Sequence, residues 1–481
     1  MLYFLIVLGL LAVLVLILAI NTLRFKPGKD AEPFEPIPLD EEMLARNLSE
    51  MIRIRTVTSA LEQDVACDAF LDFHAFLEKT YPLAHKTLER ETVGTYSLLY
   101  RWRGTGNDKK PYILLAHMDV VPINEKTLDK WQYPPFSGEI ANGYVWGRGA
   151  LDCKGQLANI MESVEYLLAD GFTPDRDIYI AFGHDEESMG FMGMQHIAQL
   201  LAERNLHFEF VFDEGGAVAN GSVVGINRLV GAVGIAEKRC VNLRLSAQSK
   251  GGHAAAPPKR TANGDIARAI AAIEKHPFPA EFDVSLVFKL ASICGYMKFP
   301  LNVIMANTWL TKPLLLKAFS FAPEGSAMVR TTMAATLVKG SHAINALAES
   351  PEAIVTMRLL PGQSLEKAVE RVQKLVGDRV KVEVFQAHSY TPKLSGLDTN
   401  AYRTIKKIIE GLYPGCVTMP YLTMPVTDSR WLGGISDDIY RFEPHKSIAE
   451  DGLTIHGAGE RITIESLREG TEFFIRLIRS V

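Results

Sequence analysis

Five side chains of metal-binding type are spread along this chain, most of them just after predicted strands. They are two imidazoles and three carboxylates: His117, Asp152, Glu187, Asp213 and His456. Neutral imidazole nitrogens and carboxylate oxygens are donors that Zn²⁺ takes at about 2.0–2.2 Å. Two zinc ions about 3.5–4 Å apart need one shared carboxylate, with an imidazole and a further carboxylate for each ion. The five residues meet this requirement without surplus.

This inventory predicts how the ligands divide between two zinc ions. His117 and Asp213 serve one ion. Glu187 and His456 serve the other, and Asp152 bridges the two. A single Asp or His at the end of a strand is more often a cap or an ordinary polar residue, but five in these contexts favour a metal site. The predicted cofactor is therefore two Zn²⁺ ions per chain.

Two further carboxylates beside the predicted ligands indicate hydrolysis. Asp119 lies two residues after His117, and two positions along an extended segment return a side chain to the same side. Its carboxylate can accept the second N–H of the imidazole and fix the tautomer. Glu186 precedes Glu187 and is not needed as a ligand, so it is predicted to act as general base and then to protonate the leaving amine. The alternative for Glu186 is an ordinary surface acid.

Short apolar runs must position these ligands. The runs are Tyr112–Ala116, Ile178–Phe182 and Phe208–Phe212, and each ends at a predicted ligand or a few residues before one. An amphipathic helix is predicted over residues 156–169. Buried apolar strands separated by helices predict a mostly parallel α/β sheet. In such sheets the site lies beyond the carboxyl ends of the strands, where these ligands stand.

The sequence pattern changes near residue 235. Val241–Ala247 alternates as a strand with one wet face does, and isoleucines spaced three and four apart mark a helix that follows. These elements predict a smaller α+β domain, of ferredoxin-like type, inserted into the larger domain at about residues 235–363. His456 lies beyond the insertion, so the predicted metal site needs both halves of the split domain.

The predicted fold class is therefore α/β, a mostly parallel-sheet dizinc hydrolase domain with an inserted smaller α+β domain and one N-terminal transmembrane helix. The predicted parts are an anchor at 1–22, a tether at 23–40, the first part of the catalytic domain at 41–234, the inserted domain at 235–363 and the second part of the catalytic domain at 364–481.

The N-terminus holds 19 residues without a charge, Leu2–Ile20. At about 1.5 Å per residue, this run just crosses a hydrocarbon core of about 30 Å. A cleaved secretion signal is the alternative, but no basic side chain precedes the run, and Ala19-Ile20-Asn21 is a poor cleavage site. Arg24, Lys26 and Lys29 follow the run, which by the positive-inside tendency favours a cytoplasmic enzyme. The predicted location is a membrane, through a single-pass N-terminal anchor.

Composition excludes one class of partner. The net charge is −5 over 481 residues, and Lys and Arg are scattered rather than clustered, so no nucleic-acid surface is expected. The five cysteines are widely spaced and give neither a disulfide framework nor a metal clip. Cys153 follows Asp152 and is expected to point away from the metal if Asp152 points toward it.

Five motifs around these residues give the chain a family resemblance. They are LLAHMDVVP (114–122), WGRGALDCKG (146–155), FGHDEES (182–188), FVFDEGG (210–216) and TIHGAGE (454–460). With them the chain resembles the co-catalytic metallopeptidases that include aminoacylase, succinyl-diaminopimelate desuccinylase and glutamate carboxypeptidase. It most resembles the branch of vacuolar carboxypeptidase S and the secreted N-fatty-acyl-amino-acid synthase/hydrolase. The resemblance runs from about residue 40 to the C-terminus, and because some members of the family act outside the cell it leaves the side of the membrane open.

The resemblance implies that the inserted domain is a lid and often a dimerisation surface, so a homodimer is expected. Within the lid, GGHAAAP (251–257) is similar to the family's histidine motif. His253 would then reach the substrate carbonyl or its oxyanion, in some members from the partner subunit. The alternative is a structural histidine in a turn.

Three residues are further candidates for holding the substrate: Asn345, Arg358 in MRLLPG and Arg430 in TDSRW. A guanidinium suits a free carboxylate because its fork matches two oxygens, although both arginines are as readily structural. The chain departs from the family pattern at two places. GAGE after His456 lacks the usual Asn before the Glu, and INALAES around Asn345 lacks a common proline. These departures concern substrate contacts rather than catalysis.

One stretch of the lid, residues 286–317, is unusually apolar. It predicts a core and dimer interface, or alternatively an acyl-binding wall near the bilayer surface that includes Phe299 and Trp309. An acyl-binding wall predicts that Ala at either position changes the preferred acyl-chain length.

The predicted function is zinc-dependent hydrolysis of an amide bond. Two substrate classes fit: a small peptide with a free C-terminal carboxylate, or an N-acyl amino acid. The alternative from another class is a catalytically silent, membrane-tethered binding protein with the same fold. An intact Glu186 beside a full ligand set speaks against that alternative.

Overall fold

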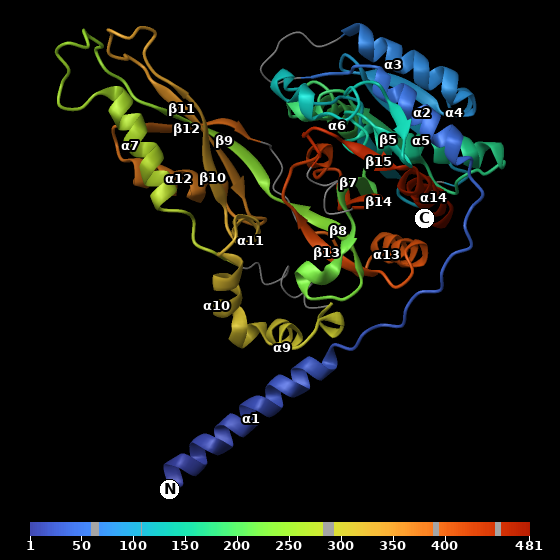
Figure 1. Ribbon diagram of the computed structural model, residues 1–481, viewed down its shortest axis with the longest axis horizontal. Coiled ribbons are helices and arrows are strands. Elements are labelled where there is room, and N and C mark those ends of the chain that lie inside the picture. The colour runs from blue at the N-terminus through green and yellow to red at the C-terminus, as the bar shows by residue number, and fades with distance from the viewer. Residues whose placement is uncertain (59–66, 107, 282–292, 388–393, 448–453) are drawn as a thin grey trace.

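The protein has two folded units and a long N-terminal helix that projects from them (Figure 1). The computed structural model describes residues 1–58, 67–106, 108–281, 293–387, 394–447 and 454–481. The larger unit contains both the first and the last parts of the chain, and the smaller unit is inserted between them.

An eight-stranded sheet forms the centre of the larger unit. Its order is β1 (Glu89–Val93), β2 (Ser97–Trp102), β6 (Ile178–Gly183), β3 (Tyr112–His117), β7 (Phe208–Asn220), β14 (Ser436–Lys446), β8 (Leu229–Glu237) and β13 (Val417–Thr423). Strands β6, β3, β7 and β14 run parallel to one another, and β8 runs parallel to β13. β1 and β2 pair antiparallel at one edge, and β14 meets β8 antiparallel. The predicted large, mostly parallel sheet is confirmed.

Helices cover both faces of this sheet, which explains the continuous apolar runs. Along β3, Tyr112, Leu114 and Ala116 belong to one core, whereas Ile113 and Leu115 belong to another. Alternate side chains of a strand point to opposite faces, so a strand between two helical layers is apolar throughout. The first layer holds α2 (Glu41–Arg53), α3 (Cys67–Thr80), α4 (Pro82–Thr87), α5 (Lys154–Ala169), α13 (Asn400–Leu412) and α14 (Ile464–Ser480), and the second holds α6 (Met194–Glu203).

The smaller unit, called the lid below, is an antiparallel sheet with two helices. Its chain order is β9 (Arg239–Ser246), α7 (Ala262–Lys275), β10 (Thr332–Lys339), β11 (Glu352–Leu359), α12 (Leu365–Val376) and β12 (Lys381–Ala387). The sheet order is β10-β11-β9-β12. This βαββαβ order and strand arrangement are those of a ferredoxin-like fold. Alternate residues of β9 pack with one face of α7 and of α12 in a core of their own.

The predicted end of the lid at residue 363 is wrong. α12 packs into the lid core through Ala368 and Val372, and β12 pairs with β9 along the lid sheet. The lid therefore extends to Ala387. Leu360-Pro361-Gly362 looks like a boundary because it breaks the strand pattern, but it is the turn between β11 and α12 inside the lid.

An apolar segment joins α7 to β10. It contains α9 (Leu301–Ala306), α10 (Thr308–Phe319) and α11 (Pro323–Met328), after a short turn η4 (Cys294–Tyr296). Residues 286–292 of the apolar stretch lie outside the described residues. The N-terminal helix α1 (Leu2–Arg24) touches α9 and has no buried residue. Among the described residues, α1 is the one helix long and apolar enough to cross a membrane, a criterion that a signal sequence also meets.

Candidate active site

Three parallel strands deliver side chains to one edge of the large sheet. His117 is the last residue of β3, and the neighbouring strand β6 ends at Gly183, just before the short turn η2 (Glu186–Ser188). Asp213 and Glu214 lie within β7, on the other side of β3. The carboxyl ends of parallel strands meet at the same edge, so these residues converge although they are far apart in sequence.

Asp152 lies between the two histidines, and each of its oxygens faces one ring. Asp152 Oδ1 is 2.9 Å from His117 Nε2, and Asp152 Oδ2 is 2.9 Å from His456 Nε2. Glu187 Oε1 lies 3.1 Å from the same nitrogen of His456. Four of the five predicted ligands therefore gather around one carboxylate, which stands where a bridging ligand is expected.

The fifth predicted ligand, Asp213, points elsewhere. Its Oδ2 accepts a hydrogen bond of 2.8 Å from the backbone N–H of Ser429, and its Oδ1 accepts one of 2.9 Å from the N–H of Glu214. The next residue takes the expected place, because Glu214 Oε1 lies 3.5 Å from His117 Nε2. Neighbouring side chains along a strand point to opposite sides, so only one of the two acids can face His117. In the structure, the side chain of Glu214 faces His117, and the side chain of Asp213 does not.

Cys153 also differs from expectation. Its sulfur and ligand atoms of His117 and Glu214 all lie within 4.8 Å of one another, so the thiol points toward the cluster and not away from it. Burial, together with the nearby carboxylate of Glu214, raises the pKa of the Cys153 thiol well above its usual value. A neutral thiol is a poor metal ligand, because the thiolate is the form that coordinates.

Asp119 orders both the imidazole and the turn that carries Glu186. His117 Nδ1 donates a 2.9 Å hydrogen bond to the backbone carbonyl of Asp119, and the Asp119 carboxylate lies 3.4 Å from the same nitrogen. A carbonyl oxygen only accepts, so the proton is on Nδ1 and Nε2 is left to face the cluster. Asp119 also accepts 3.1 Å bonds from the N–H groups of Glu186 and Glu187, and a bond from the Thr58 hydroxyl.

Glu186 stands beside the ligands and pairs with Arg430. Arg430 Nη1 donates a 2.8 Å hydrogen bond to Glu186 Oε1. Burial raises the pKa of Glu186, although the guanidinium opposes the rise. Arg430 is itself buried, and its other amino group is 3.9 Å from Asp428 Oδ1. The structure therefore places Arg430, predicted as a substrate contact, against the predicted base.

The electrostatics of the cluster fit a divalent cation. Burial and the neighbouring Asp152 raise the pKa of Glu187 to about 8, and burial raises that of Glu214 to about 7 although His117 opposes it. Hydrogen bonds with Asp152 and Glu187 raise the pKa of His456 to about 10. A bound divalent cation would oppose these rises, because a nearby positive charge favours the ionised form of a carboxyl group. The nitrogen and oxygen donors present are those that zinc accepts.

The lid residues stand apart from this cluster. His253 is exposed, forms an isolated strand bridge with Ala346, and accepts a 3.0 Å bond at Nδ1 from the N–H of Ala255. Asn345 is exposed beside it, and its carbonyl accepts a 2.9 Å bond from Ala254. The structure brings these two residues together in the lid and does not bring them to the ligands.

Arg358 lies on β11 near the base of the lid. It is half-buried, pairs across the sheet with Cys240, and one amino group, Nη1, is buried without a hydrogen-bond partner among the described residues. Burial and, to a lesser extent, the charge of Arg358 lower the pKa of neighbouring Lys238 to about 7. A buried guanidinium nitrogen without a partner is costly, which suits a site that awaits an anion.

The buried ion pair between Arg148 and Glu460, which sequence reasoning missed, holds the segment of His456 next to the segment of Asp152. Glu460 Oε1 accepts backbone hydrogen bonds of 3.0 Å from Gly149 and Leu151 and of 3.2 Å from Asp152. Its other oxygen pairs with the buried Arg148, which also donates a 3.1 Å bond to the Gly457 carbonyl. Arg148 lies in the motif WGRGALDCKG and Glu460 in the motif TIHGAGE, but the sequence does not show that the two side chains face each other.

We expect Glu460→Gln to lower the free energy of unfolding by about 3–5 kcal/mol, because it leaves the Arg148 guanidinium buried without its counter-ion. Urea denaturation measures this loss. Glu42→Gln is the matched control, since the Arg46–Glu42 pair is exposed and 3.4 Å long, and such pairs contribute about 0–1 kcal/mol. Equal losses in both variants would show that the buried pair does not stabilise the fold.

Comparison with known proteins agrees with this architecture. Residues 113–480 match the profile of peptidase family M20/M25/M40. An M20 family metallo-carboxypeptidase from Sulfolobus solfataricus shares the fold, with a TM-score of 0.65 at 16% identity over 92% of this chain and 99% of that one. This likeness concerns the fold alone, including the inserted lid.

Two relatives match at the level of sequence. A probable carboxypeptidase S-like 2 of Dictyostelium discoideum is 32% identical over 98% of this chain and 93% of its own. The N-fatty-acyl-amino acid synthase/hydrolase PM20D1 of Xenopus tropicalis is 34% identical over 92% of this chain and 86% of its own. The resemblance carried by the five motifs is confirmed. The chain belongs to peptidase family M20/M25/M40 and is a metal-dependent hydrolase that cleaves amide bonds in small substrates.

Proposed function

We propose that the site binds two zinc ions, with Asp152 as the shared ligand. The observation that carries this proposal is the placement of Asp152, whose two oxygens each lie 2.9 Å from a different imidazole. His117 and Glu214 would complete one zinc site. Glu187 and His456 would complete the other. When bound, zinc would polarise an amide carbonyl and lower the pKa of a coordinated water molecule.

The protein's own groups perform the proton transfers in this proposal. Glu186 takes the proton of the attacking water and delivers it to the leaving amine. Asp119 keeps the Nδ1–H tautomer of His117 and fixes the turn that presents Glu186. Arg430 holds the Glu186 carboxylate in place by its 2.8 Å bond.

We propose that the substrate carries a free carboxylate next to its scissile amide, as both a peptide C-terminus and an N-acyl amino acid do. Support comes from Arg358, whose buried Nη1 has no hydrogen-bond partner among the described residues. A guanidinium grips a carboxylate through two parallel bonds. His253 and Asn345 remain candidates for the substrate side of the site. Their exposure in the lid means that they contribute only after the lid closes or when a second copy of the chain supplies them.

The test is hydrolysis by the purified, zinc-loaded protein of two panels, one of dipeptides and one of N-acyl amino acids. Each substrate is paired with its carboxamide, which lacks the charge but keeps the shape. We expect turnover of at least one panel and loss of turnover for the carboxamides. Equal turnover of acid and carboxamide would contradict the proposed carboxylate site. The names of the relatives favour including long acyl chains in the second panel.

The two acids of β7 make separate predictions. We expect Glu214→Gln to lower zinc content, because it removes a carboxylate facing His117. Asp213→Asn should keep the zinc and lose about 1–3 kcal/mol of stability, because one of two backbone N–H groups loses its acceptor. Metal analysis and denaturation of both variants separate the roles. If Asp213→Asn loses zinc and Glu214→Gln retains it, Asp213 and not Glu214 is the ligand.

We also propose that α1 crosses a membrane as an anchor. Its 23 residues exceed the roughly 20 that a spanning helix needs, and none of them is buried against the protein.

A further inference from the structure

The end of the anchor helix α1 contacts the apolar segment between α7 and β10, residues 293–331, which is called the lid segment below. Asn307, between α9 and α10, is fully buried and binds the last two turns of α1. Its side chain accepts a 3.0 Å bond from Asn21 and donates bonds of 3.2 Å to the Leu18 carbonyl and 3.3 Å to the Thr22 hydroxyl. α9 and α10 are therefore held at the height where α1 ends.

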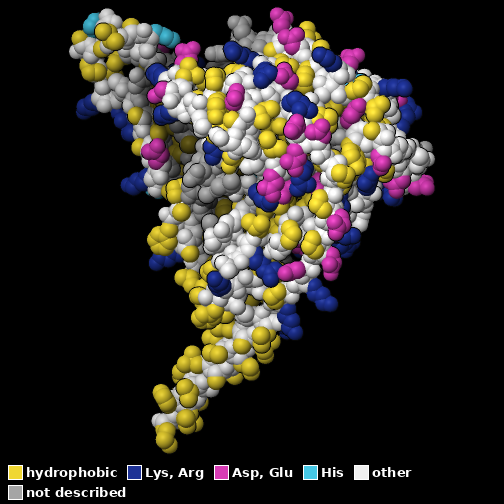
Figure 2. All heavy atoms as spheres, turned by 45° about the vertical axis from the view of Figure 1, so that its right-hand side comes forward, with side chains coloured by type: hydrophobic (Ala, Val, Ile, Leu, Met, Phe, Trp, Pro, Cys, Tyr) yellow, Lys and Arg dark blue, Asp and Glu magenta, His cyan; other side chains and the backbone are white. Residues whose placement is uncertain are grey.

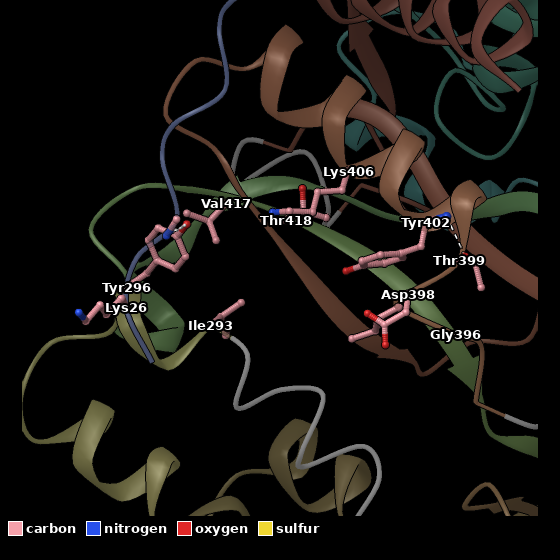
Figure 3. A pocket seen from close by; sticks show the side chains of 12 residues that line it. Lys26, Ile293, Tyr296, Gly396, Asp398, Thr399, Tyr402, Lys406, Val417 and Thr418 are labelled. Carbon is pink, nitrogen blue, oxygen red and sulfur yellow. Dashed lines mark hydrogen bonds between the residues drawn. The ribbon is translucent and has the colours of Figure 1, made fainter. Parts of the chain in front are cut away.

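That height is the edge of a bilayer if α1 spans one. The first residues after α1 run past a cavity of about 710 Å³, where the N–H of Gly28 donates a 2.7 Å bond to the Tyr296 hydroxyl. Figure 3 shows Lys26 and Tyr296 on one side of this cavity and Asp398 and Tyr402 on the other. Lys26, Asp398 and Lys406 are among the residues that line it. Charged side chains favour water over a hydrocarbon core, which favours a position of this cavity on the water side. If α1 spans a bilayer, the boundary between lipid and water therefore falls between this cavity and the body of α1.

Beside this boundary, the lid segment exposes a cluster of large apolar side chains. Phe299 and Phe321 are about four-fifths exposed and Trp309 and Leu314 more than half, and Leu301 and Leu310 add to them. In Figure 2 the hydrophobic side chains of α1 continue onto the part of the body that the helix joins. Contiguous apolar surface of this kind is rare on a soluble face and marks a contact site.

The charges of the segment suit a lipid surface. No Asp or Glu occurs between residues 284 and 323. Lys298 and Lys317 are exposed, and Lys312 is half-buried. Basic residues around an apolar surface with an exposed Trp are the composition of a segment that lies in the interface of a membrane.

We infer that α9 and α10, with Phe299 and Phe321 at their ends, form a second membrane-contacting surface that lies in the bilayer interface beside the exit of α1. This inference rests on the proposed anchor and not on the proposed hydrolysis. The occupant of the surface is the acyl-chain and headgroup boundary of a bilayer. α9 and α10 lie between α7 and β10 of the lid. The lid would therefore be attached to the membrane both by α1, through Asn307, and by α9 and α10 themselves.

The test uses the full chain in vesicles of equal parts phosphatidylcholine and phosphatidylserine, with plain or brominated acyl chains. Bromine quenches only tryptophans that reach the acyl region, and α1 has no tryptophan. We expect brominated lipid to quench part of the tryptophan emission of the unmodified protein, and Trp309→Phe to lose most of that quenching. Trp131→Phe, in the catalytic domain, is the matched control and should retain it.

Two results would overturn the inference. One is absence of quenching in the vesicle-bound, unmodified protein, as expected if a second copy of the chain covers Trp309. The other is equal quenching in the unmodified protein and in Trp309→Phe. Hydrolysis of a soluble substrate is measured on the same samples. A protein that hydrolyses but is not quenched separates failure of this inference from failure of the proposed function.

Discussion

Glu186→Gln will lower kcat by about 10²–10⁴-fold, the range that a positioned general base contributes. The amide has the shape of the acid and can still accept the hydrogen bond of Arg430, now 2.8 Å long. It cannot take a proton from water. Zinc content should stay unchanged, because Glu186 is not a proposed ligand. Thermal stability should fall, because the buried Arg430 loses the charge of its 2.8 Å partner, so rates are compared well below the melting temperature of the variant. Initial rates at saturating substrate measure the effect.

A matched substitution controls for the loss of one negative charge. Glu203→Gln makes the same change at an exposed position near the end of α6, where the acid has no proposed role. It should leave kcat within twofold of the unmodified enzyme. If Glu186→Gln also retains full turnover, Glu186 is not the base, and the proposed proton transfers fail with it.

Asp152→Asn will abolish activity and remove zinc. Among the residues that the structure describes, its carboxylate is the one group that faces both imidazoles, with an oxygen 2.9 Å from each. In the amide, one of these positions becomes an NH₂ group, which has no lone pair for a metal. Substitution of a residue that only orients a ligand lowers metal affinity by about 10–100-fold. Substitution of the shared ligand should therefore lower zinc affinity by more than about 100-fold. Metal analysis after dialysis against a weak chelator measures the loss.

Asp170→Asn is the control for this experiment. Asp170 follows α5 and makes an exposed pair with Arg479, so its amide should bind zinc as the unmodified protein does. Two zinc ions bound to Asp152→Asn with unchanged affinity would exclude the shared carboxylate. One zinc ion retained with no activity would show that the two sites bind independently and that both are needed.

Much of this architecture was predictable from the sequence because the signals are local. An apolar run that ends at an acid or a histidine marks both a buried strand and the edge at which it delivers a ligand, as at His117. Asp152 and Glu187 were found by their motifs in the same way. The inserted α+β domain was predicted from its alternating strands and amphipathic helices, and its role as a lid from the family resemblance.

The remaining differences arise from relations that a sequence does not contain. Asp213 and Glu214 are adjacent acids, and which of them faces His117 depends on the register of β7 against its neighbours. The last helix and strand of the lid were assigned to the wrong unit because a helix pattern does not reveal which core it packs against. Arg430 was predicted to meet the substrate, and its contact with Glu186 joins residues 244 positions apart.

Asp119 makes two properties of the enzyme inseparable. Its backbone carbonyl accepts a hydrogen bond from the ring of His117, and its carboxylate accepts hydrogen bonds from the backbone N–H groups of Glu186 and Glu187. Any shift of this residue would move a ligand and the base together. Metal affinity and proton transfer therefore cannot be adjusted independently at this position, and a laboratory selection for tighter zinc binding that changes it would alter the reaction rate as well.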